Sequence, residues 1–275
     1  MAKLENRYID TCFIKETDYI QKNYDYHFHH FYEIFYFISG DADYLVEGIE
    51  FHLKPHSLIL LPPDTLHSVR INSKSPYKRA CIFFYPDDIS LEHRNLLLSI
   101  FPDNKNLLQT STIYFEDTKK FDIFDAILPV INAHQNKMQK KDDGEELFSI
   151  FLENLLAKVY LMAKNTTPKN YAKPIVYAMP EIISYISNNL EKNLSLEELS
   201  KKFNISPYTL IRSFKKACGT TVLQYITYKR IVYAKQCMLN GDQAQIAAEK
   251  AGFCDYSVFY KAYVKVTGHK PSQKE

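Results

Sequence analysis

Residues 194–219 read LSLEELSKKFNISPYTLIRSFKKACG and contain the signals for two helices in close succession. Ser195 and Glu198 form the S-x-x-E pattern of a capping box, which predicts a helix that begins at Ser195. After a short break, Ser206 is a good N-cap, and Gly219 is typical of a helix end. Two short helices joined by a tight turn indicate a helix-turn-helix unit, whose second helix fits the major groove of DNA.

The same plan recurs in residues 241–268. Asp242 with Gln245 is predicted to cap a first helix, and Asp255 a second one. Residues 222–239 have a continuous helical pattern between the two units. This long helix is expected to hold the units at a fixed separation.

Residues 175–272 resemble the DNA-binding domain of the AraC/XylS-type bacterial transcription regulators, in which two helix-turn-helix units are joined by a long helix. The resemblance depends on a spaced set of residues and not on one motif. This set comprises Ser195–Ser200, Ser206–Gly219, Tyr225, Arg230, Ala234, Gly252, Phe253, Phe259, Gly268, Pro271 and Ser272. It implies an all-α C-terminal domain that binds double-stranded DNA.

The resemblance also assigns roles to the outward side chains of the second helix in each unit. The base-reading positions are Tyr208, Ile211 and Arg212 in the first unit and Ser257, Val258 and Lys261 in the second. The phosphate-contacting positions are Lys215, Lys216 and Lys265. For each charged residue, the alternative is a solvated helix face that contacts nothing.

The charge of the chain is divided unevenly along the sequence. The 275 residues carry a formal net charge of +2. Residues 1–164 hold 18 Lys+Arg and 24 Asp+Glu, a net −6, whereas residues 165–275 hold 16 and 8, a net +8. A basic C-terminal part favours a polyanionic partner such as nucleic acid.

Length and composition exclude several classes of protein. A chain of 275 residues suits two domains, and 46% hydrophobic with 24% charged residues is typical of globular proteins. No apolar run approaches the roughly 20 residues of a membrane span, and the charged N-terminus is unlike a secretory signal. Five cysteines without a C-x-x-C pair favour reduced thiols. We therefore expect a cytoplasmic protein without a membrane segment.

The pattern changes from strands to helices near residue 118. Short β-branched and aromatic runs separated by turns predict a sandwich or small barrel over residues 1–118. Residues 119–164 have a helical period and are expected either to pack on the sheet or, as the AraC/XylS resemblance implies, to form a homodimer surface, or both. Residues 165–174 indicate a linker before a DNA-binding domain over 175–275. The helical stripe comprises Leu147, Ile150, Phe151, Leu155 and Val159.

The densest group of polar residues before the linker lies in residues 24–40, YDYHFHHFYEIFYFISG. Side chains alternate along an extended strand, so His27, His29 and Glu33 are predicted on one face and His30 on the other. His67 is expected to join the first group from a neighbouring strand.

These residues resemble the cupin pattern H-x-H-x3-E-x6-G followed by P-x-G-x2-H, which implies a cupin-like β-barrel and an α+β chain of more than one domain. The matching residues are His27, His29, Glu33, Gly40, Pro62 and His67, with His56 and Asp64 at the two glycine places. Three interpretations of the polar set stay open: the lining of an effector pocket, the ligands of a divalent metal, or side chains that only pack.

For an effector pocket, the candidate residues suit a sugar-like polyhydroxy molecule, and no cofactor is expected. The effector candidates are Tyr24, Tyr26, His27, His29, Glu33 and His67. The metal candidates are His27, His29, Glu33 and His67.

Together, the patterns predict a ligand-responsive transcription regulator and not an enzyme. By resemblance it is an activator that forms a homodimer, with RNA polymerase as a further candidate partner. One alternative is a metal-dependent cupin enzyme, a dioxygenase or isomerase, fused to a DNA-binding domain. The other is a nucleoid-type structural DNA binder, which needs no pocket.

Overall fold

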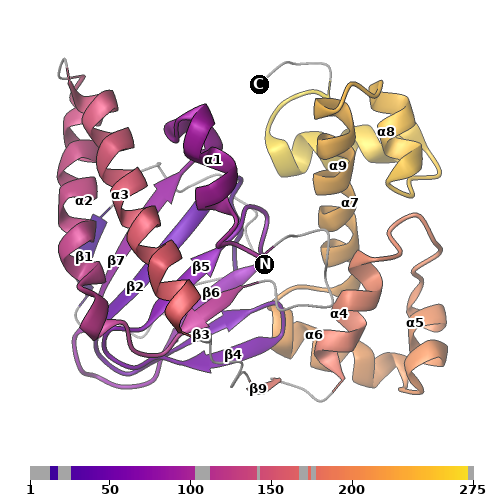
Figure 1. Ribbon diagram of the computed structural model, residues 1–275. Coiled ribbons are helices and arrows are strands. Elements are labelled where there is room, and N and C mark those ends of the chain that lie inside the picture. The colour runs from indigo at the N-terminus through magenta and orange to yellow at the C-terminus, as the bar shows by residue number, and fades with distance from the viewer. Residues whose placement is uncertain are drawn as a thin grey trace.

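The computed structural model describes residues 13–17, 26–102, 112–140, 143–166, 173–174 and 178–271 (Figure 1). The strands are β1 (Phe13–Thr17), β2 (Tyr32–Ser39), β3 (Ala42–Val46), β4 (Ile49–His52), β5 (Leu58–Leu61), β6 (His67–Ile71), β7 (Tyr77–Phe84), β8 (Ile113–Phe115) and β9 (Lys173–Pro174). The helices are α1 (Leu91–Leu98), α2 (Ile123–Met138), α3 (Gly144–Asn165), α4 (Met179–Ser187), α5 (Leu196–Phe203), α6 (Pro207–Cys218), α7 (Val222–Leu239), α8 (Ala244–Lys250) and α9 (Tyr256–Thr267). Among the described helices, none has the length and apolar character that a membrane crossing requires.

The strands form two facing sheets and not the closed barrel that the cupin resemblance implied. One sheet has the order β1-β7-β2-β5-β8 and the other β6-β3-β4-β9. Within the described residues, no edge strand of one sheet is hydrogen-bonded along its length to an edge strand of the other, so the barrel stays open. A single isolated bridge, between His27 and His67, lies between them. The N-terminal half is therefore a β-sandwich, which we call the sheet domain, and the α+β class is confirmed.

Strand β2 is apolar along most of its length because both of its faces are buried. Ile34 and Tyr36 pack against the layer formed by α2 and α3, while Phe35 and Phe37 point between the two sheets. The sheet domain thus has three layers: helices, the five-stranded sheet and the four-stranded sheet (Figure 1). Because side chains alternate, the carboxylate of Glu33 points between the sheets, as predicted.

Four of the five residues in the apolar stripe predicted for α3 pack on one core. Leu155 and Val159 are fully buried between the helices and the sheet. Leu147 and Phe151 are partly buried and pack against the same core. Ile150 is 52% exposed and is the member of the stripe that lies outside this core, because α3 is apolar on more than one side.

The segment predicted as a linker contributes to the sheet domain. Helix α3 continues to Asn165, the first residue of that segment. Lys173 and Pro174 at its other end form β9, which pairs antiparallel with Glu50 and Ile49 of β4. The chain is therefore tied back to the four-stranded sheet before the C-terminal helices begin.

The helix ends of the two helix-turn-helix units follow most of their local signals. Ser195, Ser206 and Asp255 each accept a hydrogen bond from a backbone N–H in the first turn of α5, α6 and α9. Gly219 ends α6 with a φ of 66°, the left-handed region that glycine adopts without steric cost. Helix α7 spans the predicted residues 222–239.

The cap predicted at Asp242 was wrong. Helix α8 begins after Gln243, whose side chain makes no capping bond. The carboxylate of Asp242 instead accepts two hydrogen bonds from Lys250 Nζ, at 2.9 and 2.7 Å. Asp242 therefore forms no capping box with Gln245. Lys250, at the end of α8, is a charged partner for its carboxylate and binds it instead.

We predict that Leu155→Ala lowers the free energy of unfolding of the sheet domain by about 2–5 kcal/mol, because it leaves a cavity in a fully buried position. Urea denaturation followed by circular dichroism measures this loss. Leu128→Ala removes the same atoms from a side chain of α2 that is 40% exposed, and is expected to cost much less. Equal losses for the two variants would contradict the assigned core.

Candidate DNA-binding surface and sensor centre

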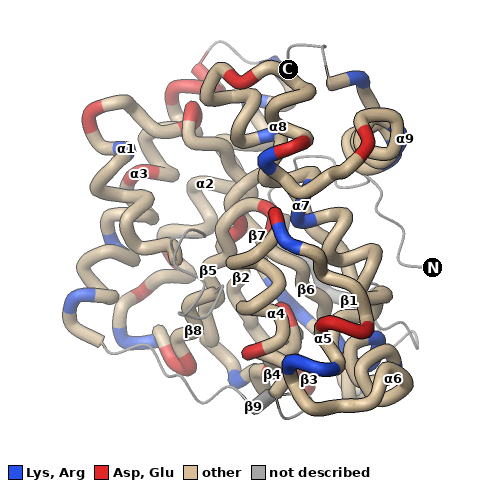
Figure 2. The backbone as a smooth tube through the Cα atoms, turned by 90° about the vertical axis from the view of Figure 1, so that its right-hand side faces the viewer, with Lys and Arg blue, Asp and Glu red and all other residues tan. Residues whose placement is uncertain are grey.

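The two recognition helices, α6 and α9, lie along the same side of the molecule at opposite ends of α7 (Figure 2). All nine side chains predicted to contact DNA are exposed on them. These residues are Tyr208, Ile211, Arg212, Lys215 and Lys216 on α6, and Ser257, Val258, Lys261 and Lys265 on α9. Two of the large hydrophobic members are well exposed to solvent, Tyr208 at 73% and Val258 at 59%. The structure thus brings the predicted residues into two exposed sets on one side.

The relative position of the two units depends on α7. The Arg230 guanidinium donates to the backbone carbonyls of Leu190 and Lys192 at 2.9 and 2.8 Å, which ties α7 to the turn before α5. Gly252, at the turn between α8 and α9, lies so close that a Cβ atom there would be 2.1 Å from the Leu190 carbonyl oxygen. Both residues belong to the spaced set found in the sequence, and both connect the two units.

Three of the predicted polar residues converge between the two sheets, and we call His29, Glu33 and His67 the sensor centre. His29 Nε2 lies 2.9 Å and His67 Nε2 3.2 Å from the same carboxylate oxygen, Glu33 Oε2. Their ligand atoms lie within 4.8 Å of one another, and all three side chains are buried. His27 lies beside them, with its ring centroid 4.2 Å from that of His67.

The other ring nitrogens of the sensor centre are held by the backbone. His29 Nδ1 lies 2.9 Å from the Phe31 carbonyl oxygen, and His67 Nδ1 lies 2.8 Å from that of Thr65. A carbonyl oxygen and a carboxylate both accept hydrogen bonds, so each ring has an acceptor at Nδ1 and another at Nε2. Backbone carbonyls that orient imidazoles in this way are typical of metal-ligating histidines.

Burial sets the charge of the centre. It lowers the pKa of the His29 imidazole, and this effect outweighs the neighbouring Glu33 carboxylate, so His29 is neutral at pH 7. Burial raises the pKa of the Glu33 carboxyl, but the imidazoles of His29 and His67 outweigh it and hold the pKa well below its usual range. Glu33 is therefore a buried carboxylate anion beside neutral imidazole.

The enclosed space next to the sensor centre is small. Its volume is about 30 Å³. The lining residues are Phe13, His27, Glu33, Phe35, Tyr44, His67, Val69, Arg79, Cys81 and Phe83. This volume holds about one or two water-sized occupants. A sugar-sized molecule does not fit unless the aromatic side chains move.

Among the described pocket candidates, His29 and Tyr26 do not line this cavity, and of these two only His29 belongs to the sensor centre. The Tyr26 hydroxyl donates to the Ala217 carbonyl of α6 at 2.7 Å, so Tyr26 contacts the DNA-binding half and does not line the sensor centre. The pocket assignment of Tyr26 was wrong because this residue precedes β2 and is held by this distant contact. Tyr24 lies outside the described residues. His30 contacts Asp64 and not the centre, as expected.

Sequence reasoning missed the buried Arg79 and Tyr44 in the cavity wall. It also missed the contacts of two acidic turn residues, Glu47 and Asp64. A signal for one of these turn residues was present. His56 and Asp64, which occupy the glycine places of the cupin pattern, have φ values of 71° and 62°. Non-glycine residues in this left-handed region are uncommon and often mark special positions.

Comparisons with known proteins agree with this division into two halves. Residues 12–114 match the model of an AraC-like ligand binding domain, and residues 199–274 match that of a helix-turn-helix domain. The chain is 26% identical over 241 residues to the arabinose operon regulatory protein of Escherichia coli strain K12, covering 86% of this chain and 77% of that protein. It is 23% identical over 237 residues to the lactose operon transcription activator of Staphylococcus xylosus, covering 85% and 74%.

Among solved structures, ToxT from Vibrio cholerae O395 is similar over 95% of each chain, with 15% identity and a TM-score of 0.38. The matched models and curated relatives describe regulators and support the regulator over the enzyme alternative. Since both halves match, in the order in which the sequence presents them, the chain belongs to the AraC/XylS family of DNA-binding transcription regulators.

Proposed function

We propose that this regulator acts in the cytoplasm as a homodimer, senses its effector at the centre between the two sheets and activates transcription. The observation that carries the DNA-binding part is the exposure of all nine candidate residues on α6 and α9, which share one side of the molecule (Figure 2). Two recognition helices on one side can enter successive major grooves about one helical turn apart. Activation is supported by the similarity to the lactose operon transcription activator of Staphylococcus xylosus.

The geometry of the sensor centre favours a divalent cation as the effector or as part of its site. Each ring places its two nitrogens against two acceptors: Nδ1 of His29 and of His67 faces a backbone carbonyl oxygen, and Nε2 of both faces Glu33 Oε2. A neutral imidazole has one proton for two such acceptors, so one contact of the ring is left without a proton. A cation bound by the two Nε2 atoms and the carboxylate would resolve this shortage, and nitrogen and oxygen ligands suit a first-row divalent metal. The alternative remains the polyhydroxy effector.

We predict that tag-free protein binds about one equivalent of Zn²⁺ and that His67→Ala and Glu33→Gln each weaken binding more than about tenfold, because each removes a ligand. Isothermal titration with Zn²⁺ measures the affinity. His93→Ala is the matched control, because this exposed imidazole pairs with Glu153 away from the centre. Unchanged Zn²⁺ binding by both centre variants would contradict the metal proposal. Pentose binding without metal binding would favour the polyhydroxy effector instead.

We predict that Arg212→Ala lowers DNA affinity and relaxes one base preference, at a cost of about 1–3 kcal/mol, because a bidentate contact to guanine is lost. Lys216→Ala is expected to weaken binding to all DNA sequences alike. It is also expected to reduce the slope of log affinity against log salt concentration by about 1. Fluorescence anisotropy with duplexes selected by the full-length protein measures both effects. Lys164→Ala, on α3, is the charge-matched control. If Arg212→Ala lowered the affinity for all base variants of the site equally, Arg212 would not be a base-reading residue.

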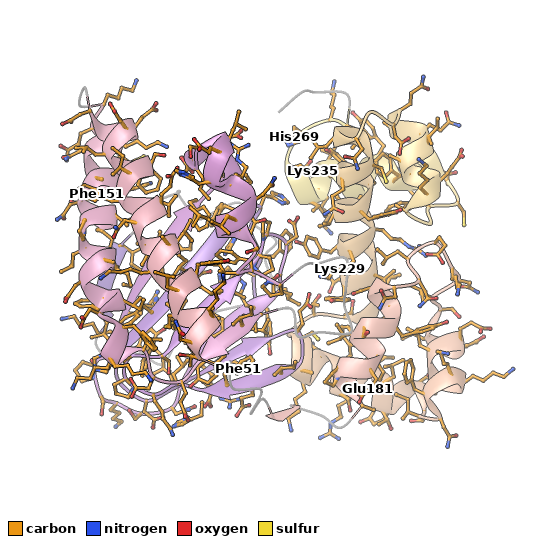
Figure 3. The ribbon with its side chains drawn as sticks, in the orientation of Figure 1. Phe51, Phe151, Glu181, Lys229, Lys235 and His269 are labelled. Carbon is orange, nitrogen blue, oxygen red and sulfur yellow. The ribbon has the colours of Figure 1, made fainter. Side chains whose placement is uncertain are left out.

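The outer face of α3 supports the homodimer. Ile150 and Leu161 are 52% and 60% exposed, and their separation of 11 residues places them on the same helix face. Such side chains on one face are typical of a helix that packs against a partner. Phe151, labelled in Figure 3, lies partly buried on the same helix.

We predict that Ile150→Glu with Leu161→Glu converts the dimer to a monomer, because it places two carboxylates in an apolar contact. Light scattering coupled to size-exclusion chromatography measures the mass. Leu91→Glu, in a side chain of α1 that is 81% exposed, is expected to leave the dimer intact. A dimer that survives the double substitution would place the interface elsewhere.

A further inference from the structure

Two acidic residues at turns of the sheet domain contact α7, the helix that joins the two helix-turn-helix units. The first is Glu47, at the turn between β3 and β4. Its Oε1 accepts hydrogen bonds from Lys229 Nζ at 2.6 Å and from the Tyr225 hydroxyl at 3.1 Å. Figure 3 shows Lys229 on α7, where the C-terminal helices meet the sheet domain. The side chains of Glu47 and Lys229 are only 4% and 13% exposed, so this ion pair is largely removed from water.

The second acidic residue, Asp64, lies in the loop between β5 and β6. Its Oδ1 accepts a hydrogen bond from the Tyr228 hydroxyl at 3.3 Å and lies 2.5 Å from His30 Nδ1, and its backbone carbonyl oxygen lies 3.4 Å from Lys229 Nζ. Tyr225, Tyr228 and Lys229 are spaced at i, i+3 and i+4, which places them on one face of α7. One face of this helix therefore meets both carboxylates.

The backbone at both carboxylates is held in an uncommon conformation. Glu47 has a φ of 44° and Asp64 a φ of 62°, in the left-handed region where L side chains are strained. Such strain persists only where surrounding contacts hold it, and it is frequent in switch regions. The tyrosine partners are suited to donate, since burial raises the pKa of Tyr225 and Tyr228 well above its ordinary value and keeps both hydroxyls protonated.

The same turns are hydrogen-bonded to the sensor centre. The Asp64 backbone N–H donates to the His29 carbonyl oxygen at 2.8 Å, and the Glu47 N–H donates to that of Leu66 at 3.0 Å. His67 Nδ1 is bonded to the carbonyl oxygen of Thr65, in the same loop. Residues 64–67 therefore touch the sensor centre through His29 and His67 and touch α7 through Asp64.

We propose that Glu47 and Asp64 form a latch that fixes α7, and with it both recognition helices, relative to the sheet domain, and that residues 64–67 transmit the state of the sensor centre to this latch. The latch itself is independent of the effector, whereas its control by the sensor centre rests on the function proposed above. A ligand can release the latch only if it binds the released state of the protein more tightly than the latched state. It would do so by shifting residues 64–67. Release would reorient the DNA-reading side relative to the dimer surface.

The latch is tested on the full chain without DNA or effector. Spin labels on Cys254 and on Leu91→Cys, both at exposed positions, report the distance between the two halves in a protein whose Cys12 is replaced by Ser. We expect a narrow distribution of distances for this parent. Glu47→Gln with Asp64→Asn is expected to broaden it about twofold or more. An unchanged width would overturn the latch.

Two further variants separate the latch from a general loss of structure. Glu50→Gln is the matched control, because Glu50 lies in the same hairpin but pairs with Arg70 of the sheet domain, and it is expected to keep the narrow distribution. In the charge exchange, Glu47→Lys is combined with Lys229→Glu. We expect its distribution of label distances to be narrower than that of either single substitution. Broadening by Glu50→Gln, or no recovery in the exchange, would refute the specific pairing.

The transmission by residues 64–67 is tested with Zn²⁺ as the probe on the same labelled protein. We expect saturating Zn²⁺ to change the distance distribution of the parent and to have no effect on His67→Ala. A parent that binds Zn²⁺ by calorimetry but keeps its distribution would overturn the transmission and leave the latch standing. Absence of Zn²⁺ binding would instead overturn the metal proposal, on which this transmission test depends.

Discussion

The position of the DNA-reading half depends on one buried ion pair, between Lys229 of α7 and Glu47 of the sheet domain. Removing one partner of such a pair costs about 3–5 kcal/mol, because the other charge stays buried and unpaired. A second contact acts in the same region. The Tyr26 ring occupies the space next to Gly219, where a Cβ atom would lie 2.1 Å from a ring carbon, and its hydroxyl binds the last turn of α6. Gly219 therefore ends α6 and also makes room for the sheet domain.

The interior of the sheet domain combines dense aromatic packing with a small polar centre. Phe35, Phe37 and Tyr44 fill the space between the sheets, which leaves the Glu33 carboxylate away from water. A buried carboxylate is costly unless charged or polar groups compensate for it. The two imidazoles lie at the correct distance to do so, but their second nitrogens are already occupied by backbone carbonyls. This shortage of protons supports the proposed cation over the interpretation that these side chains only pack.

Local signals in the sequence predicted local structure well, and contacts between distant segments account for the errors. Ser206 and Asp255 cap their helices because a cap needs only the next few residues, whereas Asp242 is taken by Lys250 eight residues later. The alternation of β2 correctly placed Glu33 between the sheets. The pocket role expected of the Tyr26 hydroxyl was wrong, because this hydroxyl bonds to Ala217, 191 residues away in sequence. Sheet closure depends on edge strands that no local pattern specifies. Glu47 was missed for the same reason, since its partner lies on α7.

The basic residues of the C-terminal half fall into two groups, one exposed to water and one buried. The lysines of α6 and α9, which we propose as phosphate contacts, are exposed, so salt screens their charge strongly. Lys229 belongs to the same basic half, but its side chain is 13% exposed and pairs with a carboxylate of the acidic half. Salt screens such a buried pair much less. The division into −6 and +8 therefore supports DNA binding at one surface and domain docking at another, and ionic strength weakens the first before the second.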